Sequence, residues 1–530
     1  MSASSGGNPR RVRDLPQVKW PIVGLLLISF FLLLFRLGSS GLHDWDEGIY
    51  AQVSKEILQT GDWQTLHWMG RSWYEKPPLF LWITAAAYKV GGVSEWTARL
   101  PSALAACGLF CLLPFFGKHL GSRWIGVSAI LILLTDREFM FRSRFGTLDV
   151  LLTFLIFASL YGYLLFQAGN PRGWLLVGLS FGLAVMDKGA AAVVIPVIIG
   201  AEVLLDGFSR LRQVLRSREF WAGICIAAAI AVPWHLVMTL HAGRAFWHEY
   251  MGTQVLARVT TGVYTVNQGG RLYYLSTLQE HLFPWFFPGL FALAFAVRDV
   301  LRDRNRGLRL VLLTAGVIFA TYTVVHTKNP WYVIPLHPAI ALLVSAAMVE
   351  AWKNKDVAIA GGAFVSGILN MLMAARTAAA IFGTVLIGVH LALRKKPAAW
   401  AVGITAAVAA CTLLTGYAEI RALYRPSESD IVHLSKIVSQ EFPNDRSPVV
   451  FFGYPYGITG PGPAFTYYSD RPYEWADVYD RLPQYFQTSQ SRPVILAQKD
   501  LHEFESGYDL KVQLAYKSLV YGTATLQANK

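Results

Sequence analysis

The sequence predicts a polytopic α-helical membrane protein with a small α/β domain at its C-terminal end. Of the 530 residues, 54% are hydrophobic and only 15% are charged, whereas charged residues make up about a quarter of a typical soluble protein. Long apolar runs recur up to about residue 418, and the composition then becomes that of a soluble domain. We therefore divide the chain into a tail (1–19), a transmembrane part (20–418) and a soluble domain (419–530).

Membrane-spanning helices need about 20 apolar residues each, which gives thirteen candidates. They lie near 20–37, 97–117, 123–135, 148–167, 172–186, 189–206, 220–240, 282–297, 309–325, 332–352, 357–374, 376–393 and 398–417. Basic residues precede the first of these, but no convincing cleavage site follows it, so we expect a retained span rather than a signal peptide.

Charge orients these spans. With the N-terminus in the cytoplasm, every predicted inside loop carries Lys or Arg, as the positive-inside rule requires. The outer loops 38–96 and 241–281 and the C-terminal domain then share the extracytoplasmic face. The net charge of +13 is spread over short clusters between apolar runs, which indicates contact with membrane lipids and argues against nucleic acid as a partner. The four cysteines lie in apolar stretches and predict no disulfides.

The first outer loop contains an acidic cluster of Asp44, Asp46 and Glu47. Asp46 precedes an amphipathic pattern that predicts a helix capped by this acid and ended by Gly61. Capping accounts for one acid and leaves the other two unexplained. Residues 79–91 are apolar but too short to span, and predict an interfacial or re-entrant helix.

Four further clusters share the predicted outer face. Each has a purely structural alternative, such as a local ion pair, a polar turn or a kinked helix with interfacial aromatics. A charged group at the membrane surface is nevertheless a functional hypothesis by default. The four clusters are Glu75-Lys76-Pro77-Pro78, Arg142 and Arg144 followed by Asp149, Asp187-Lys188-Gly189, and the proline-broken segment from Lys328 to Pro338 with Tyr332 and His337.

The C-terminal domain alternates helical and strand patterns. Helices are predicted over 428–442 and 478–488, strands over 448–453 and 493–497, and the segments 509–516 and 518–526 complete a small α/β layer. The stretch 453–463 is rich in Gly and Pro but lacks the phosphate-binding G-x-x-x-x-G-K-[ST] pattern, so we interpret it as a loop.

Together the clusters bring carboxylates and fixed cations to one face. Carboxylates suit a general base that deprotonates an alcohol, or a divalent metal, whereas cations suit a phosphate that must leave. No Ser-His-Asp arrangement or H-E-x-x-H motif is present. We therefore expect transfer of a group from a lipid phosphate.

The motifs resemble those of GT-C glycosyltransferases in the superfamily of bacterial aminoarabinose transferases and protein O-mannosyltransferases. The resemblance covers most of the membrane part, and the order and spacing of the motifs carry it. The matching pieces are Asp46-Glu47-Gly48-Ile49-Tyr50, Glu75 to Leu79, Asp149 after Arg142 and Arg144, Asp187-Lys188-Gly189, Gly269-Gly270 with Tyr273-Tyr274, Pro284-Trp285, and Lys328 to Pro338; in the soluble domain Phe465 to Pro472 is the most similar stretch.

The resemblance implies transfer of a sugar, with inversion, from a polyprenyl-phosphate carrier to a lipid, glycan or protein acceptor outside the bacterial inner membrane. It implies that Asp46 is the general base or an acid that orients the acceptor, and that Glu75 is a metal ligand. The acids grouped as catalytic are Asp46, Glu47 and Asp149, and the donor-site residues are Lys76, Arg142, Arg144, Lys188, Arg258, Lys328 and Tyr332. One departure concerns the second loop, where aminoarabinose transferases have a histidine shortly before an arginine, whereas residues 254–258 read Gln-Val-Leu-Ala-Arg. The departure weakens the assignment of a divalent metal as cofactor and that of lipid A as the acceptor.

Two other classes of function remain open. A transporter or flippase for a lipid-linked precursor also needs charges in a membrane cavity, but no internal repeat is present and the charges gather at one face, which favours an enzyme. A sensor with an outer ligand-binding domain would need only one or two spans.

Overall fold

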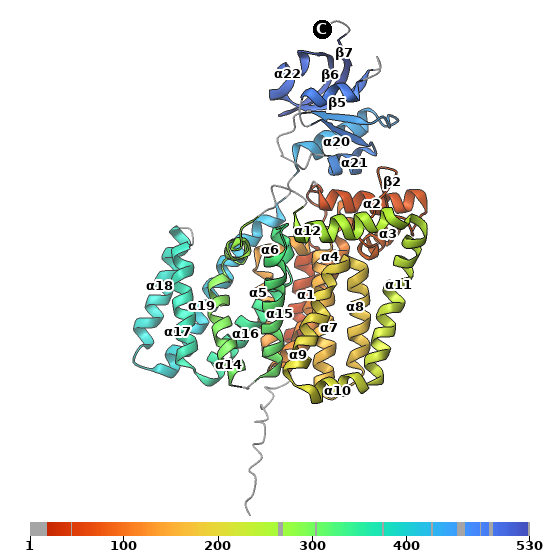
Figure 1. Cartoon of the computed structure of the whole chain (residues 1–530). Helices are drawn as coiled ribbons and strands as arrows, with labels where there is room; N and C mark the ends of the chain where they lie inside the picture. The colour runs from red at the N-terminus through yellow and green to blue at the C-terminus, as the bar shows by residue number, and fades with distance from the viewer. Residues whose placement is uncertain are drawn as a thin grey trace, which may run out of the picture.

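The computed structural model describes residues 19–43, 45–262, 269–302, 305–373, 376–425, 428–452, 462–476, 479–486 and 491–527. Figure 1 shows a bundle of long helices with a small mixed domain at one end. We call this end of the bundle the domain end and the other the opposite end. The predicted fold class, a polytopic helical membrane protein with a C-terminal α/β region, is confirmed.

Each predicted span contains a helix in the structure. These helices are α1 (Lys19–Leu34), α4 (Glu95–His119), α5 (Arg123–Leu134), α7 (Asp149–Gln167), α8 (Gly173–Lys188), α9 (Val194–Leu205), α11 (Arg218–Trp247), α14 (Phe286–Leu301), α15 (Arg306–Val324), α16 (Leu336–Asn354), α17 (Val357–Met373), α18 (Arg376–Leu393) and α19 (Pro397–Ile420). Among the described residues, six helices are long and apolar enough to cross a membrane, or seven if the bent pair α13 (Tyr273–His281) and α14 forms one span. The number thirteen stays a prediction.

The stretch Gly173–Leu205 is one of those six by length, yet it runs along the bundle twice. Lys188, at the end of α8, contacts Asp149, the first residue of α7. Glu202, near the end of α9, accepts a hydrogen bond from Gln167, the last residue of α7. The chain therefore reverses between them, at the 3-10 helix η1 (Gly189–Val193), as the predicted tight turn requires.

Glycines let the helices of the bundle approach closely. A Cβ atom added to Gly178 of α8 would lie 2.0 Å from the carbonyl oxygen of Gly223 in α11, and one added to Gly126 of α5 would lie 1.9 Å from that of Leu113 in α4. Small residues at such crossings are how helices gain packing contacts in lipid, where burial of apolar surface between helices drives little association.

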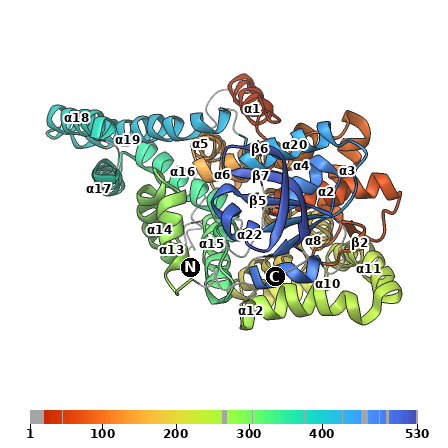
Figure 2. The same ribbon diagram turned by 90° about the horizontal axis from the view of Figure 1, so that it is seen from above.

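Helix α11 changes direction at the domain end. Gly243 has φ 50° and ψ −119°, which breaks the helical geometry, and the chain continues as the π-helix η2 (His248–Ala257) and α12 (Arg258–Thr260). Figures 1 and 2 show that this continuation lies across the end of the bundle rather than along it. We call residues 244–260 the crossing segment. It begins where the sequence predicts the outer loop 241–281.

The first loop also lies at the domain end. It contains α2 (Asp46–Thr60), a hairpin of β1 (His67–Trp68) and β2 (Arg71–Ser72), and α3 (Leu79–Gly91). The predicted helices are present, and α2 ends at Gly61 in a left-handed conformation as expected. The prediction that Asp46 caps α2 is wrong: Trp45 is the N-cap, and no side chain caps the helix. Asp44 lies outside the described residues.

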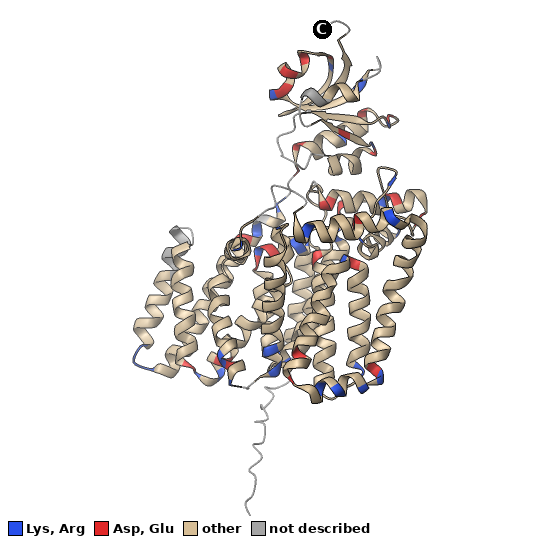
Figure 3. Cartoon of the chain, in the orientation of Figure 1, with Lys and Arg blue, Asp and Glu red and all other residues tan. Residues whose placement is uncertain are grey.

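Short elements connect the long helices. They are α6 (Arg137–Ser143), α10 (Phe208–Arg216), η4 (Pro330–Val333) and η5 (Arg421–Tyr424). Figure 3 shows that the charged residues gather at the two ends of the bundle and that the middle of the helices has almost none, as expected for a chain in lipid. All four cysteines are free, as predicted, with Cys107 and Cys411 buried and Cys111 and Cys225 exposed.

The C-terminal domain contains a five-stranded sheet in the order β4-β3-β5-β7-β6. Strand β3 pairs in parallel with β4 and β5, whereas β7 pairs antiparallel with β5 and β6. One face of the sheet packs on α20 and α21, and the other on η7 and α22. The elements are α20 (Asp430–Glu441), β3 (Val449–Phe452), α21 (Gly462–Ser469), β4 (Tyr473–Ala476), η7 (Tyr479–Tyr485), β5 (Arg492–Ala497), η8 (Gln498–Asp500), α22 (Leu501–Glu505), β6 (Tyr508–Tyr516) and β7 (Leu519–Leu526).

The sequence patterns located most of this domain. The helix predicted over 428–442 and the two predicted strands are observed, and the two segments predicted to complete the layer are the strands β6 and β7. The helix predicted over 478–488 is a 3-10 helix, η7, within the described residues. Most of the predicted loop 453–463 lies outside the described residues. Helix α21 and strand β4 were not predicted.

Candidate active site

A cavity of about 440 Å³ opens at the domain end of the bundle. Its lining comes from α2, the loop before α3, the start of α7, the turn between α8 and α9, the crossing segment, and the end of α15 with η4. Polar and charged side chains in the lining are Asp46, Tyr50, Glu75, Lys76, Asp149, Lys188, Tyr250, Gln254, Arg258, Thr321, Tyr322, Asn329 and Tyr332. The predicted clusters around residues 46, 75, 149, 188 and 330 therefore meet in one pocket.

Two carboxylates in the pocket have different surroundings. Asp149, the first residue of α7, forms an ion pair with Lys188. Asp46, the first residue of α2, is half-buried. Burial raises the pKa of Asp46 above its usual range, although the nearby Lys76 acts in the opposite direction. A carboxylate with a raised pKa is a stronger base than an ordinary aspartate, which suits proton abstraction.

Cations and a phenol lie near these acids. The Lys76 ammonium donates a hydrogen bond to the Gln254 side-chain oxygen, 2.9 Å away. Burial, together with the charge of Arg258, lowers the pKa of Lys76 to about 8. Arg258 donates to the Tyr332 hydroxyl at 2.7 Å, and the Lys188 ammonium lies 5.3 Å from the centre of the Tyr332 ring. Because such groups bind phosphate oxygens, this side of the pocket suits a phosphate.

Glu47 points away from the pocket and forms a buried ion pair with Arg99 of α4. The pair is bidentate, with nitrogen–oxygen distances of 2.7 and 2.9 Å, and the two residues are 0% and 3% exposed. Burial would raise the pKa of Glu47, but the Arg99 charge outweighs this and lowers the pKa. Because its charge is neutralised by a buried partner, Glu47 has a structural role in this site.

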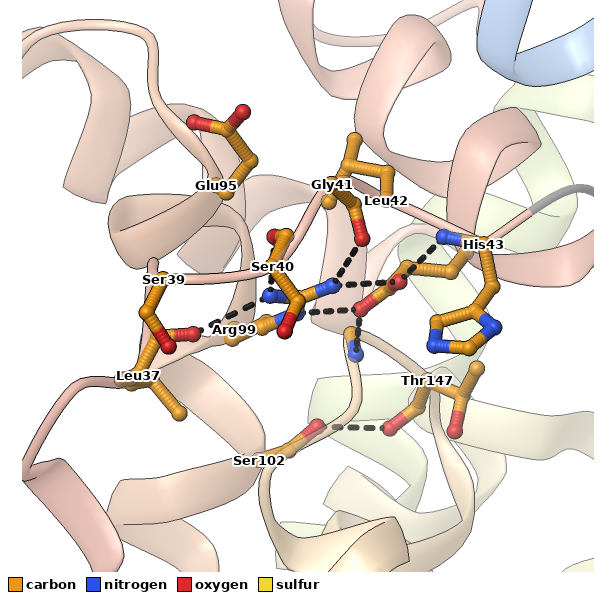
Figure 4. A network of polar contacts seen from close by, with 12 residues as sticks. Leu37, Ser39, Ser40, Gly41, Leu42, His43, Glu95, Arg99, Ser102 and Thr147 are labelled. Atoms are coloured by element: carbon orange, nitrogen blue, oxygen red, sulfur yellow. Dashed lines mark hydrogen bonds and ion pairs between the residues drawn. The ribbon is translucent and has the colours of Figure 1, made fainter. Parts of the chain in front are cut away.

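The Glu47–Arg99 pair also connects the two pocket acids. Glu47 accepts hydrogen bonds from the backbone N–H of His43 and of Gly146, both at 2.8 Å. His43 lies just before α2, which begins with Asp46, and Gly146 just before α7, which begins with Asp149. Arg99 donates to the carbonyl oxygens of residues 37, 40 and 41 (Figure 4). We call these contacts the Glu47–Arg99 frame, since they position both acid-bearing helices.

Three cations predicted for the donor site contact other parts of the protein. Arg142 pairs with Glu138 at 2.7 Å and stacks on Trp331, so it lies behind a pocket residue. Arg144 donates to carbonyl oxygens at the C-terminal end of α1. Lys328 donates to carbonyl oxygens at the end of α15. None of the three is in the pocket lining, and the last two satisfy helix ends that lack intrahelical partners.

The sequence alone did not identify some residues of the pocket and of the Glu47–Arg99 frame. Arg99 gave a usable signal, because an arginine within the apolar span 97–117 needs a partner. Tyr250 gave none, since only the path of the crossing segment brings it to the pocket, whereas Gln254 stood in the stretch compared with the family's histidine without a role assigned to it. His337 was noted in its cluster, but it bonds to buried Asp136, 2.6 Å away, and lies outside the pocket lining.

The metal prediction gains no geometric support. Glu75 lines the pocket, yet within the described residues no group of three or more His, Cys, Asp or Glu side chains could hold a metal ion. Gln254 stands in the stretch where the resembling family has a histidine, and it bonds to Lys76. The described residues of the pocket thus present no ready-made metal site, and we assign no step to a divalent metal.

Comparison with known proteins places this fold in a class. A family model described as dolichyl-phosphate-mannose-protein mannosyltransferase matches residues 75–236. The crystal structure of ArnT from Cupriavidus metallidurans bound to undecaprenyl phosphate superposes with a TM-score of 0.69, at 18% identity, over 96% of this chain and 98% of that one. An oligosaccharyltransferase from Archaeoglobus fulgidus in the apo form gives a TM-score of 0.55, at 13% identity, over 93% and 70%. Both likenesses define the GT-C fold.

Curated sequences give a consistent result. The chain is 27% identical over 357 residues to the undecaprenyl phosphate-alpha-4-amino-4-deoxy-L-arabinose arabinosyl transferase of Aeromonas salmonicida, covering 65% of this chain and 63% of that protein. It is 29% identical over 378 residues to the enzyme of that name from Pseudomonas aeruginosa, covering 67% and 64%. The matches thus span just under two thirds of these relatives. In sequence and in fold the chain is therefore similar to GT-C glycosyltransferases, which supports the resemblance inferred from its motifs.

Proposed function

We propose that this protein is an integral-membrane glycosyltransferase that moves a sugar from a polyprenyl-phosphate donor to a lipid, glycan or protein acceptor. One observation carries the proposal: the pocket at the domain end joins Asp46 and Asp149 with the Lys76, Arg258 and Tyr332 group. Such a site can activate a hydroxyl and stabilise a departing phosphate in the same space.

The donor phosphate is assigned to the side formed by Lys76, Arg258 and Tyr332. Lys76 and Arg258 supply positive charge and Tyr332 a hydroxyl. The donor phosphate gains negative charge as its bond to the sugar breaks. These three groups therefore stabilise the transition state more than the ground state. Apolar residues of the same pocket, including Val194, Val259 and Val325, suit the first part of a lipid chain.

Asp46 is assigned as the base. Its carboxylate takes the proton of the acceptor hydroxyl as the acceptor oxygen bonds to the anomeric carbon of the sugar. The bond from that carbon to the phosphate oxygen breaks on the opposite side, and the electron pair leaves with the phosphate, which inverts the configuration. Asp149 remains paired with Lys188. We therefore assign this pair an electrostatic role near the reacting centre and no part in proton transfer.

The comparisons support the donor class. The ArnT structure has undecaprenyl phosphate bound, and an oligosaccharyltransferase of Archaeoglobus fulgidus, with a TM-score of 0.55, is in complex with an inhibitory peptide and a dolichol-phosphate. We extend the polyprenyl-phosphate class to this chain. The basic residues in the predicted inside loops support an orientation with the N-terminus in the cytoplasm and the pocket outside a bacterial inner membrane.

Two experiments test the proposal. Mass spectrometry of lipids, glycans and proteins from cells with and without the chain should show one component that loses a sugar. The purified full chain in liposomes should then transfer that sugar from its polyprenyl-phosphate form, releasing polyprenyl phosphate. An unchanged envelope in cells lacking the chain, together with movement of a lipid-linked sugar across liposomes without transfer, would favour the transporter instead.

A further inference from the structure

Helix α2 has two buried faces with different neighbours. Asp46, Ile49 and Tyr50 line the pocket. On another side of the same helix, Gly48 and Ala51 face α21 of the C-terminal domain: a Cβ added to Gly48 would lie 2.8 Å from the backbone nitrogen of Ala464, and Ala51 belongs to a buried cluster with Tyr467. The helix that carries the proposed base is therefore held between the cavity and the soluble domain.

Polar contacts fasten this interface at both ends of α2. Near its C-terminal half, the Lys55 ammonium donates to the carbonyl oxygen of Tyr467 at 2.9 Å and pairs with Asp470 at 2.6 Å. Just before its N-terminus, the Tyr468 hydroxyl accepts a hydrogen bond from the backbone N–H of Leu42, 2.9 Å away.

Tyr468 also reaches the membrane helices. Its hydroxyl donates to the Glu95 carboxylate at the start of α4, 2.9 Å away. Lys436 of α20 lies over the Tyr468 ring, 4.8 Å from its centre, and pairs with Glu95 at 3.4 Å. One hydroxyl of the soluble domain thus joins the segment entering α2 to the helix that carries Arg99 of the Glu47–Arg99 frame.

The backbone beside the base needs such support. Trp45, directly before Asp46, has φ 74° and ψ −125°, a conformation that costs a non-glycine residue free energy and persists only where surrounding contacts hold it. Contacts at Leu42 and His43 hold the chain on one side of Trp45, through Tyr468 and Glu47. Gly48 packs on α21 on the other side.

We infer that the C-terminal domain positions the base: Tyr468, through its bonds to the Leu42 N–H and Glu95, sets the path of the chain into α2 and thereby the placement of Asp46. The inference rests on the proposed function and deepens it. Tyr468 does not line the pocket, so it is a positioning residue. A small displacement of a reacting group from its productive geometry lowers the rate of the chemical step and leaves binding of the donor unchanged.

The test compares Tyr468→Phe with Tyr516→Phe in the full-length chain reconstituted in liposomes. Tyr516 stacks on His433 within the same domain, at 4.2 Å between ring centres, which makes it a matched control. Tyr468→Phe should lower kcat about tenfold and leave the KM for the lipid-linked donor within about twofold. The control should retain both values. An equal kcat for Tyr468→Phe and the control would overturn the inference.

Hydrogen exchange supplies a readout independent of turnover. Peptides covering residues 41–50 should exchange faster in Tyr468→Phe than in the control, because the Leu42 N–H loses its acceptor. Unchanged exchange there would overturn the inference even if the wild-type protein transfers no sugar, whereas absence of transfer by wild type alone contradicts the proposed function. If Tyr468→Phe does not accumulate, Glu95→Gln weakens the same contact from the membrane side and carries the same predictions.

Discussion

The two ends of the bundle each contain a cluster of charges, and the clusters differ in how the charges are satisfied. At the opposite end, Arg309 of α15 bonds to both Glu202 and Asp206, with Glu202 completely buried. At the domain end, the bonds of the Lys76 ammonium within the described residues go to neutral oxygens, those of Gln254 and of the Glu75 backbone, and Lys76 faces a cavity.

This difference separates a structural cluster from a functional one. The charges of Arg309, Glu202 and Asp206 at the opposite end are paired with one another. Their bonds hold α9 against α15 and leave no charge for a ligand. Charges at the domain end include a base and cations held apart around a space large enough for a sugar phosphate. Structural and functional charges can also be neighbours in the sequence: Glu47 is paired within the Glu47–Arg99 frame, whereas Asp46, the residue before it, lines the pocket.

The largest expected effect is on the base. Asp46→Asn removes the proton acceptor at nearly constant size, so transfer should fall about a thousandfold or more. Thermal unfolding and membrane insertion should not change. Glu441→Gln, an exposed acid at the end of α20, is the control. Near-normal turnover of purified Asp46→Asn protein would rule out this residue as the base.

A substitution in the cluster at the opposite end should lower stability and leave transfer unchanged. Arg309→Met leaves Glu202 buried without its partner, which should lower the free energy of unfolding by about 3 kcal/mol. The folded fraction should keep its kcat/KM. Arg302→Met, at an exposed position just after α14, should change neither the free energy of unfolding nor kcat/KM. A folded Arg309→Met protein that has lost transfer would show that this cluster also serves function.

Removal of a phosphate contact should have a smaller effect. Lys76→Ala should lower kcat/KM for the lipid-linked donor about a hundredfold, as loss of one donor to a developing anion does elsewhere. Lys89→Ala, an exposed lysine of α3, is the control. Unchanged donor kinetics in Lys76→Ala would remove this residue from the donor site.

The smallest effect concerns pH. Asp46 must be deprotonated and Lys76 protonated, so kcat/KM should rise with pH through the raised pKa of Asp46 and fall as pH passes about 8, the lowered pKa of Lys76. Lys76→Arg should move the alkaline limb to higher pH and leave the acid limb in place. An alkaline limb that stays near pH 8 in this variant would assign it to another group.

Much of this organisation could be read from local sequence. Apolar run length located the long helices of the bundle, and the sequence pattern located the strands around residues 449 and 493 and the segments that complete the sheet around 509 and 519. Order and spacing singled out Asp46, Lys76, Asp149 and Lys188, which meet in the pocket. These features depend on residues near each other in the chain, where composition and periodicity carry the signal.

Only the tertiary structure decided which charges face the cavity. Glu47 and Asp46 are adjacent and equally acidic in sequence, yet Arg99 binds one and the pocket receives the other. Likewise Arg144 and Lys328 satisfy helix ends, whereas Arg258 reaches Tyr332 because the chain turns at Gly243. A side chain's partner is set by how distant helices pack and where each helix ends, and composition along the chain does not encode either directly.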